Sequence, residues 1–326
     1  MAAPVVLKTL FGCTGCMAAI ESLNKESLRT MDLMTFTTFL FVSLHGVVFT
    51  SKFFKVPNRI PIVSYLPIVV IFFLVSTANN HALSYSVPIP LVITLRSGAL
   101  VSNMLIGKLW LRHSYSTQKL VSILVITVGI VLFTLETVSA GGVRHDVTEG
   151  TTVTQAIGVT LLIGALLFSS FLGHYQQKLY VKYGKHDEEA MFYVHLLSLP
   201  GFLLLLPSIR TGMNDIIISP HLQIAGTHIP VPVAACKLVL IIIFQWICIK
   251  NVYRLTSVTD SLNVTLVTTL RKFLSLSLSV IFFDNRFTII HGAAFLLVTL
   301  GTFFYNDSLF AWLRSSWDGS AKKKKQ

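Results

Sequence analysis

Two arginines inside apolar segments are the residues of this chain best suited to bind a charged ligand. The string LVITLR, residues 91–96, recurs with one change as LVTTLR, residues 266–271, and a serine follows each arginine by six positions. Both copies lie in stretches long enough to cross a bilayer, where a charged side chain costs roughly 2.5–3.5 kcal/mol on insertion scales. Such charges are seldom kept without a partner or a ligand, so the pattern favours an anion that crosses the membrane.

The second copy places two cations together, because Lys272 follows Arg271 about eleven residues into its expected span. A mid-span position is poor for snorkelling, since long side chains reach the interface mainly from helix ends. A planar guanidinium beside a compact ammonium suits a diphosphate, so we expect Arg271, Lys272 and the nearby Thr269 to bind one. Arg96 either joins this site or serves as a structural or gating charge, and we favour the second role.

Amide side chains lie near the ends of two other expected spans, at Asn79, Asn80 and Asn251. Amides suit the hydroxyls of a ribose or a sugar. Membrane helices also use Asn to bond one another, so both interpretations stay open.

A third group, Phe192, Tyr193 and His195, offers two aromatic faces and an imidazole within one span. This set suits the stacking of a base and a hydrogen bond to its edge. A lone histidine on a packed helix is equally compatible with a structural role.

The composition requires membrane helices to position these residues. The 326-residue chain is 53% hydrophobic and 12% charged, with a mean hydropathy of +0.71, which excludes an ordinary soluble domain. We predict an all-α membrane protein with ten transmembrane helices, each of about 17–25 residues. The expected spans are 4–23, 33–50, 61–78, 88–111, 120–138, 153–176, 190–207, 232–250, 260–283 and 287–306.

The distribution of Lys and Arg predicts the topology, because short cytosolic loops carry the excess. With a cytosolic N-terminus, sixteen of these residues fall on the cytosolic side and five on the other. The cytosolic set is Lys52, Lys55, Arg59, Lys108, Arg112, Lys119, Lys178, Lys182, Lys185, Lys250, Arg254, Arg314 and Lys322 to Lys325. Both termini are therefore expected in the cytosol, and the net charge of +12 follows from topology without a nucleic-acid partner.

Ten spans divide into two sets of five, and because five is odd the second set enters the membrane in the opposite sense. The string TVG, residues 127–129, also resembles TLG, residues 299–301. We expect two inverted repeats, 1–140 and 153–308, joined by a lumenal loop, 141–152, and followed by a cytosolic basic tail, 309–326. Inverted repeats are typical of transporters that hold their substrate near the midplane.

Enzymatic chemistry has little support in the sequence. The longest connections, 136–152 and 208–231, are too short to fold as catalytic domains. No pair of carboxylates or cluster of metal ligands is visible, so we expect neither catalysis nor a cofactor or metal. All four cysteines fall within expected spans, where a disulfide framework would have no role, and Cys13 and Cys16 are interpreted as small residues at a helix contact.

The tail ends in KKKKQ, which places Lys324 and Lys323 third and fourth from the C-terminus. On a cytosolic tail this pattern resembles a dilysine retrieval signal, which coat proteins recognise. A polybasic anchor to lipid headgroups is the alternative.

Several strings resemble the nucleotide-sugar transporters of the drug and metabolite transporter superfamily across nearly the whole chain. They are NNHAL at 79–83, RSG at 96–98, YGKH at 183–186, EAMFYVH at 189–195, LPGF at 199–202 and VTLVTTLRKF at 264–273. The resemblance implies an antiporter of the Golgi and/or endoplasmic reticulum membrane. It implies import of UDP-N-acetylglucosamine and/or UDP-xylose in exchange for the nucleoside monophosphate UMP.

Related GDP-mannose carriers have FYNN and GALNK motifs, which Phe192, Tyr193 and Lys272 match, whereas Val194, His195 and Arg271 replace their asparagines. These replacements favour a uridine ligand over guanine. Two other functions stay open, a carrier of phosphate esters or small metabolites on the same fold and a non-transporting scaffold for a glycosyltransferase. A homo-oligomer is also possible.

Overall fold

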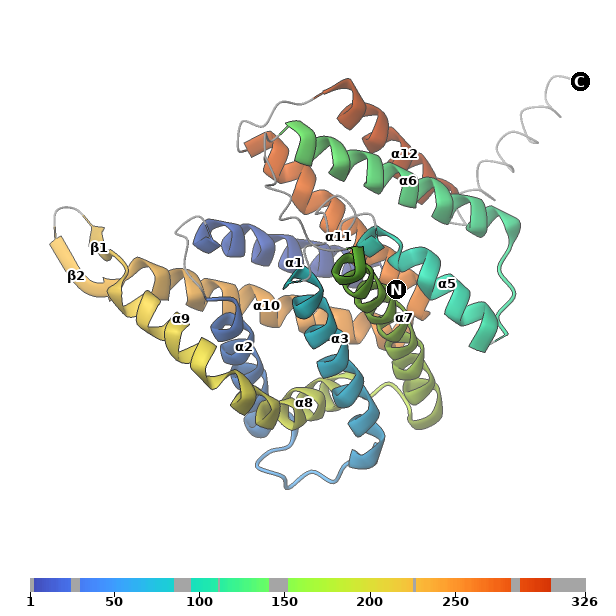
Figure 1. Cartoon of the computed structure of the whole chain (residues 1–326). Helices are drawn as coiled ribbons and strands as arrows, with labels where there is room; N and C mark the ends of the chain where they lie inside the picture. Colours follow the sequence, from blue (N-terminus) through green and yellow to red (C-terminus); the bar gives the residue numbers. More distant parts are fainter. Residues whose placement is uncertain are drawn as a thin grey trace, which may run out of the picture. The chain divides into compact units, whose positions relative to one another are not determined.

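The computed structural model describes residues 3–24, 30–84, 95–110, 112–140, 152–224, 227–282 and 288–305. Its helices, shown in Figure 1, are α1 (Ala3–Asn24), α2 (Met31–His45), the π-helix η1 (Gly46–Thr50), the 3₁₀-helix η2 (Ile62–Tyr65), α3 (Leu66–Ser84), α5 (Ala99–Trp110), α6 (Thr117–Ala140), α7 (Thr152–Tyr183), α8 (Asp187–Ser198), the 3₁₀-helix η3 (Leu199–Leu205), α9 (Leu206–Ile218), α10 (Val233–Val258), α11 (Ser261–Phe282) and α12 (Ile289–Tyr305). The strands are β1 (His221–Ile224) and β2 (Thr227–Pro232).

The predicted helical class is confirmed. Five helical segments of the described residues are long and apolar enough to cross a membrane, namely Met31–Thr50, Thr117–Glu136, Gln155–Tyr183, Asp187–Ile218 and Val233–Val258. Shorter apolar helices cover Pro4–Ile20, Ile62–Val75 and Ile289–Tyr305. The loop at 141–150, the start of the expected span 88–111 and the tail with Lys323 and Lys324 lie outside the described residues.

The expected span 190–207 is part of a longer segment with a change of helix type. Helix α8 passes into η3 at Leu199 and then into α9, which ends at Ile218. Pro200 and Pro207 stand at the starts of η3 and α9, where a residue without an N–H is tolerated. The predicted connection 208–231 is therefore partly helix. It also holds the antiparallel β1–β2 hairpin, in which His221 pairs with Pro232 and Ile224 with Thr227.

The chain divides into two compact units, and each combines segments from both halves of the sequence. Unit 1 comprises residues 1–76 and 171–275, and unit 2 comprises residues 77–170 and 276–326. Helices α3, α7 and α11 each contribute to both units.

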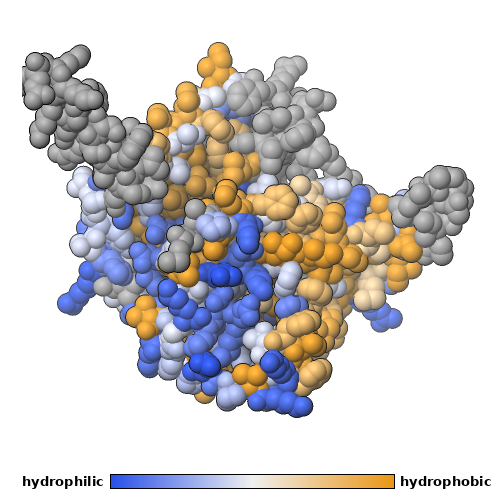
Figure 2. Space-filling view, turned by 180° about the vertical axis from the view of Figure 1, so that it is seen from behind, coloured by the Kyte–Doolittle hydropathy of each residue, from blue (hydrophilic) through white to orange (hydrophobic). Residues whose placement is uncertain are grey.

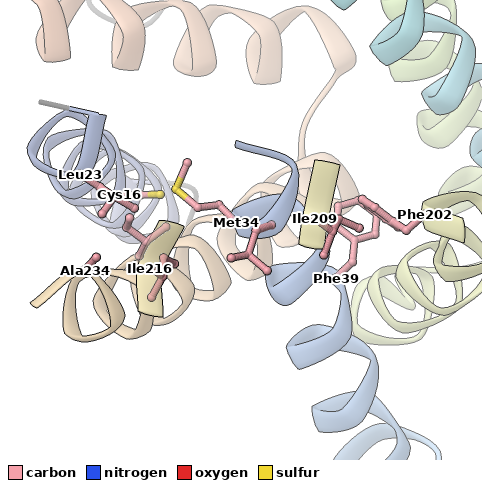
Figure 3. Packing of buried hydrophobic residues seen from close by; sticks show 10 residues of the cluster. Cys16, Leu23, Met34, Phe39, Phe202, Ile209, Ile216 and Ala234 are labelled. Atoms are coloured by element: carbon pink, nitrogen blue, oxygen red, sulfur yellow. The ribbon is translucent and has the colours of Figure 1, made fainter. Parts of the chain in front are cut away.

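The core of unit 1 is a cluster of apolar side chains from α1, α2, η3, α9 and α10. Figure 3 shows Cys16, Leu23, Met34, Phe39, Phe202, Ile209, Ile216 and Ala234 of this cluster, all buried. Helix α1 packs along α10, and the close approach requires glycine. A Cβ atom at Gly12 would lie 2.8 Å from Ile247 Cγ2, and one at Gly15 would lie 2.9 Å from Phe244 Cε1.

In unit 2, α6 and α12 pack as an antiparallel pair (Figure 1). A Cβ atom at Gly129 would lie 2.8 Å from Val298 Cγ2, and one at Gly301 would lie 2.7 Å from Ile126 Cγ1. The contact is reciprocal, because each glycine meets the residue three positions before the other glycine. These are the glycines of the matching TVG and TLG strings.

Hydrophobic side chains occupy much of the surface. Figure 2 shows broad hydrophobic areas beside a hydrophilic one. Leu204 and Ile289, for example, are 86% and 92% exposed. Apolar surface on this scale is expected of helices that face lipid.

Candidate functional site

Arg271 lies on α11 within unit 1 and is directed toward α10. Its Nη1 donates to Sγ of Cys248 at 3.8 Å, and the thiol of Cys16 on α1 lies within electrostatic range of the same guanidinium. The charge is therefore held against the α1–α10 pair. Thr269, two positions earlier on α11, is buried at 4% exposure.

Helices α1 and α10 are also joined covalently beside Arg271. A disulfide connects Cys13 to Cys248 with their Cα atoms 4.6 Å apart, and Cys16 donates to Oε1 of Gln245 at 2.7 Å. The expectation that cysteines within spans form no disulfide is wrong. Gly12 and Gly15 are the reason, because they let the two helices approach closely enough for the sulfur atoms to meet.

His195 is enclosed by aromatic rings in unit 1. Its Nδ1 lies 2.6 Å from the carbonyl oxygen of Met191, and its ring centroid lies 4.4 Å from that of Phe39 and 5.9 Å from that of Tyr253. The residue is 4% exposed. The structure thus brings α2, α8 and α10 together around the imidazole.

Phe192 and Tyr193 precede His195 on α8 and are also buried. The Phe192 ring packs directly on Gly46, where a Cβ atom would lie 2.2 Å from its Cδ2. The Tyr193 ring stacks on Tyr65 with centroids 5.6 Å apart, and its hydroxyl donates to Oδ1 of Asn58. Both rings are therefore covered by residues of the segment 46–65.

The predicted amides are placed differently. Asn251 lies on α10, one helical turn after Cys248, and its amide donates to the carbonyl oxygen of Ile247 at 2.7 Å. Asn79 and Asn80 belong to the part of α3 that lies in unit 2, and Lys272 follows Arg271 on α11. The structure describes the helical backbone at Asn79, Asn80 and Lys272 but not their side chains.

Arg96 belongs to unit 2 and its side chain is exposed. The turn around it is closed by a bond from the Gly98 amide to the carbonyl oxygen of Leu95. Ser102, the serine six positions after Arg96, is buried and hydrogen-bonded to Ser170 at 2.8 Å. The repeated arginines thus have different local surroundings.

A cavity of about 80 Å³ lies in unit 1 between α1, α2 and α10. Its lining includes Thr35, Thr38 and Gln245 among the apolar side chains of Ile20, Met31, Met34, Phe39 and Ile241. Gln245 lies one turn before Cys248 on α10, so the cavity is lined by the same helix that Arg271 contacts. No group of His, Cys, Asp and Glu that could hold a metal occurs among the residues that the structure describes.

Sequence reasoning missed Glu189, which binds the segment that covers Phe192 and Tyr193. The carboxylate of Glu189 accepts bonds from the amides of Arg59 and Ile60 and from the hydroxyl of Tyr65. The available signal was the run of three acidic residues, Asp187 to Glu189, in the first turn of α8, a position where the helix dipole usually explains negative charge.

Comparison with known proteins shows which family this chain belongs to. Residues 2–309 match the UAA transporter family. The chain belongs to the UAA transporter family. It is 38% identical over 302 residues to the UDP-xylose and UDP-N-acetylglucosamine transporter of Danio rerio. The aligned region covers 91% of each of the two chains.

Two further relatives of this UAA-family protein are informative. It is 37% identical over 313 residues to the endoplasmic reticulum GDP-fucose transporter of Drosophila melanogaster, with 92% of this chain and 88% of the relative covered. It is 36% identical over 300 residues to the nucleotide sugar transporter SLC35B4 of Homo sapiens, with 91% of each covered. The resemblance drawn from its sequence strings is confirmed at the level of the family.

Proposed function

We propose that this UAA-family protein is an antiporter that carries UDP-N-acetylglucosamine and/or UDP-xylose into the lumen of the Golgi or endoplasmic reticulum and returns UMP. The observation that carries this proposal is the 38% identity, over 91% of both chains, to a transporter named for those two nucleotide sugars. The apolar helices supply the membrane part that such a carrier needs.

The proposed architecture has ten spans in two inverted repeats with both termini in the cytosol. The reciprocal contact between α6 and α12 supports it. Gly129 and Gly301 occupy matching positions in the two halves, and each contacts the helix of the other in the same register. A two-fold relation between the halves would produce such a contact, because every contact that one helix makes is then repeated with the roles of the two helices exchanged.

In the proposed site, Arg271 and Lys272 bind the diphosphate with Thr269 beside them. The contact of Arg271 with Cys248 supports this role, because the guanidinium is directed from α11 toward α10 rather than toward lipid. The exchange of one ligand for the other follows from the charge of this site. A carrier whose cations are not neutralised reorients slowly in the membrane, whereas either anionic ligand lowers that cost.

The nucleoside is assigned to Phe192, Tyr193 and His195, and the sugar to Asn79, Asn80 and Asn251. The three residues of α8 are close together and buried, which suits a base held away from water. Because other side chains cover the Phe192 and Tyr193 rings in this structure, a base must displace that cover before it reaches them.

The proposal is tested with purified protein in liposomes preloaded with UMP. We expect uptake of labelled UDP-N-acetylglucosamine or UDP-xylose that requires internal UMP and is lost in Lys272→Ala. Retained exchange by that variant would remove Lys272 from the phosphate site. Absence of uptake by the unaltered protein would favour a small-metabolite carrier or a scaffold.

A GDP-sugar is the second candidate substrate. It is favoured by the 37% identity to the GDP-fucose transporter, which is within one percentage point of the UDP-sugar relative. Liposomes preloaded with GMP and offered labelled GDP-fucose decide between the two, because a uridine-selective carrier takes up none.

A further inference from the structure

Three hydrogen bonds to one carboxylate of α8 help to hold the segment that follows η1 across the start of that helix. Residues 51–65 are here called the strap. Oε1 of Glu189 accepts the Ile60 amide at 2.9 Å and the Tyr65 hydroxyl at 3.2 Å, and Oε2 accepts the Arg59 amide at 3.1 Å. Three donors converge on one ionised acceptor, and hydrogen bonds to a charged acceptor are stronger than neutral ones.

The fastened strap covers the aromatic pair of α8. Asn58 accepts the Tyr193 hydroxyl, the Tyr65 ring stacks on the Tyr193 ring, and Phe54 lies against Phe192 with ring centroids 6.0 Å apart. Tyr65 and Ile60 are fully buried. The bonds to Glu189 therefore hold in place the side chains that cover Tyr193.

The strap begins in a strained conformation. Lys52, Phe53 and Phe54 have φ of +47°, +58° and +61°, which is the left-handed region that residues with a Cβ avoid. Only Ser51 separates them from η1, and π-helical turns are frequent at functional sites. Strain of this kind persists only where surrounding contacts impose it. Local bonds close this turn, from the Phe53 amide to the carbonyl oxygen of Val47 at 2.8 Å and from the Phe54 amide to the Ser51 hydroxyl at 3.2 Å, so it is the point about which the strap can turn.

The fastening lies at one end of the helices of unit 1. At the same end Glu188 pairs with Lys250 at 3.0 Å, and Tyr175 of α7 donates to the carbonyl oxygen of Ser64 in the strap at 3.2 Å. The distribution of Lys and Arg in the sequence predicts that the connections at this end are cytosolic. Movement of the strap would therefore open unit 1 toward the cytosol.

We propose that Glu189 is the positioning residue of a latch: its carboxylate fastens the strap over Phe192 and Tyr193, and the nucleotide reaches these two rings only after the Glu189 bonds release. This inference rests on the proposed function, since it concerns access to the same nucleoside site. Glu189 itself does not touch the substrate.

The test compares Glu189→Gln with the control Glu188→Gln in full-length protein in lipid nanodiscs. Both variants lose one negative charge in the first turn of α8, but only Glu189→Gln replaces one of the two oxygens that accept the strap bonds by an NH2 group, which donates. Hydrogen exchange in peptides covering residues 56–66 is expected to be at least tenfold faster for the two anchored amides in Glu189→Gln and unchanged in Glu188→Gln. Unchanged exchange in Glu189→Gln would overturn the fastening role.

Equilibrium binding of labelled UDP-N-acetylglucosamine supplies the second readout. If the covered state excludes the ligand, only the uncovered fraction of the protein binds it, and the apparent affinity is reduced by that fraction. Loosening the strap enlarges the uncovered fraction and therefore tightens binding. We expect Kd to fall at least threefold in Glu189→Gln and to stay within 1.5-fold in Glu188→Gln. General damage to the fold would weaken binding instead. Equal or weaker binding by a variant with a loosened strap would refute the latch.

Tyr65→Phe provides a second variant that leaves Glu189 and its charge in place. It removes one donor to the carboxylate, so both readouts should move in the same direction by a smaller factor. Failure of the proposed function is separately visible, because the unaltered protein would then bind no nucleotide sugar. In that case the proposed control of nucleotide access would also be refuted. Hydrogen exchange would still decide whether Glu189 fastens the strap.

Discussion

Substitution of Gly46 by alanine tests the packing that places Phe192. Gly46 begins η1, and an added Cβ would lie 2.2 Å from Cδ2, 2.7 Å from Cγ and 2.8 Å from Cβ of Phe192. A rotation of the ring does not relieve the contact, because the Cβ of Phe192 is fixed by the backbone of α8. Helix α2 and helix α8 must therefore separate.

The expected magnitude follows from two opposing effects. Inserting a methyl group into a packed core costs about 1–3 kcal/mol, and three contacts below 3.0 Å place this position at the upper end. Replacing glycine by alanine within a helix gains about 1 kcal/mol. The net loss at Gly46 is thus about 2 kcal/mol. Gly164 on α7 is the control, because its Cβ would meet nothing within 4 Å and only the gain of about 1 kcal/mol remains.

The assay is thermal unfolding of the purified protein in detergent. Gly46→Ala is expected to lower the midpoint and Gly164→Ala to leave it unchanged or raise it. The loss caused by Gly46→Ala should be smaller in a Phe192→Ala background, because alanine removes Cγ and Cδ2 of the clashing side chain. Coupling between the two positions is read from the double-mutant cycle. Equal midpoints for Gly46→Ala and Gly164→Ala, or additive effects in the cycle, would refute the contact and with it the placement of Phe192.

Three further outcomes are expected. Arg271→Gln should reduce nucleotide-sugar exchange in liposomes at least tenfold, because it removes a cation from the proposed phosphate site but keeps a polar side chain. Peptide mapping under non-reducing conditions should recover Cys13 joined to Cys248, and Cys13→Ala should lower the free energy of unfolding by roughly 2–4 kcal/mol. Gly129→Ala and Gly301→Ala should each lower the unfolding midpoint by similar amounts, since each adds a methyl group to one side of the same reciprocal contact.

Each of these outcomes has a result that contradicts it. Exchange by Arg271→Gln at the unaltered rate would exclude a phosphate role for that residue. Recovery of Cys13 and Cys248 only as separate thiols would contradict the covalent tie between α1 and α10. A strong effect at Gly129 with none at Gly301 would argue against a two-fold relation between α6 and α12.

The sequence predicted the properties that depend on neighbouring residues. Apolar runs predicted the helices, because a membrane span is defined by the hydropathy of about twenty consecutive residues. The five segments long enough to cross a membrane fall where spans were expected, and the strings around Phe192 and Arg271 indicated the family that the comparison shows. The change of helix type after Leu199 could also have been anticipated, since Pro200 and Pro207 are visible in the sequence.

The tertiary structure decided which of these helices meet and how. Cys13 and Cys248 are 235 residues apart, and Glu189 lies 129 residues from Ile60, so no local pattern pairs them. Their contacts depend on glycines that let backbones approach and on a carboxylate that satisfies backbone amides of a distant segment. Local hydropathy thus determined where this chain forms long apolar helices and that Arg271 lies within one of them. The covering of Phe192 and Tyr193 was decided by packing, because steric fit and hydrogen-bond geometry arise only when distant segments are brought together.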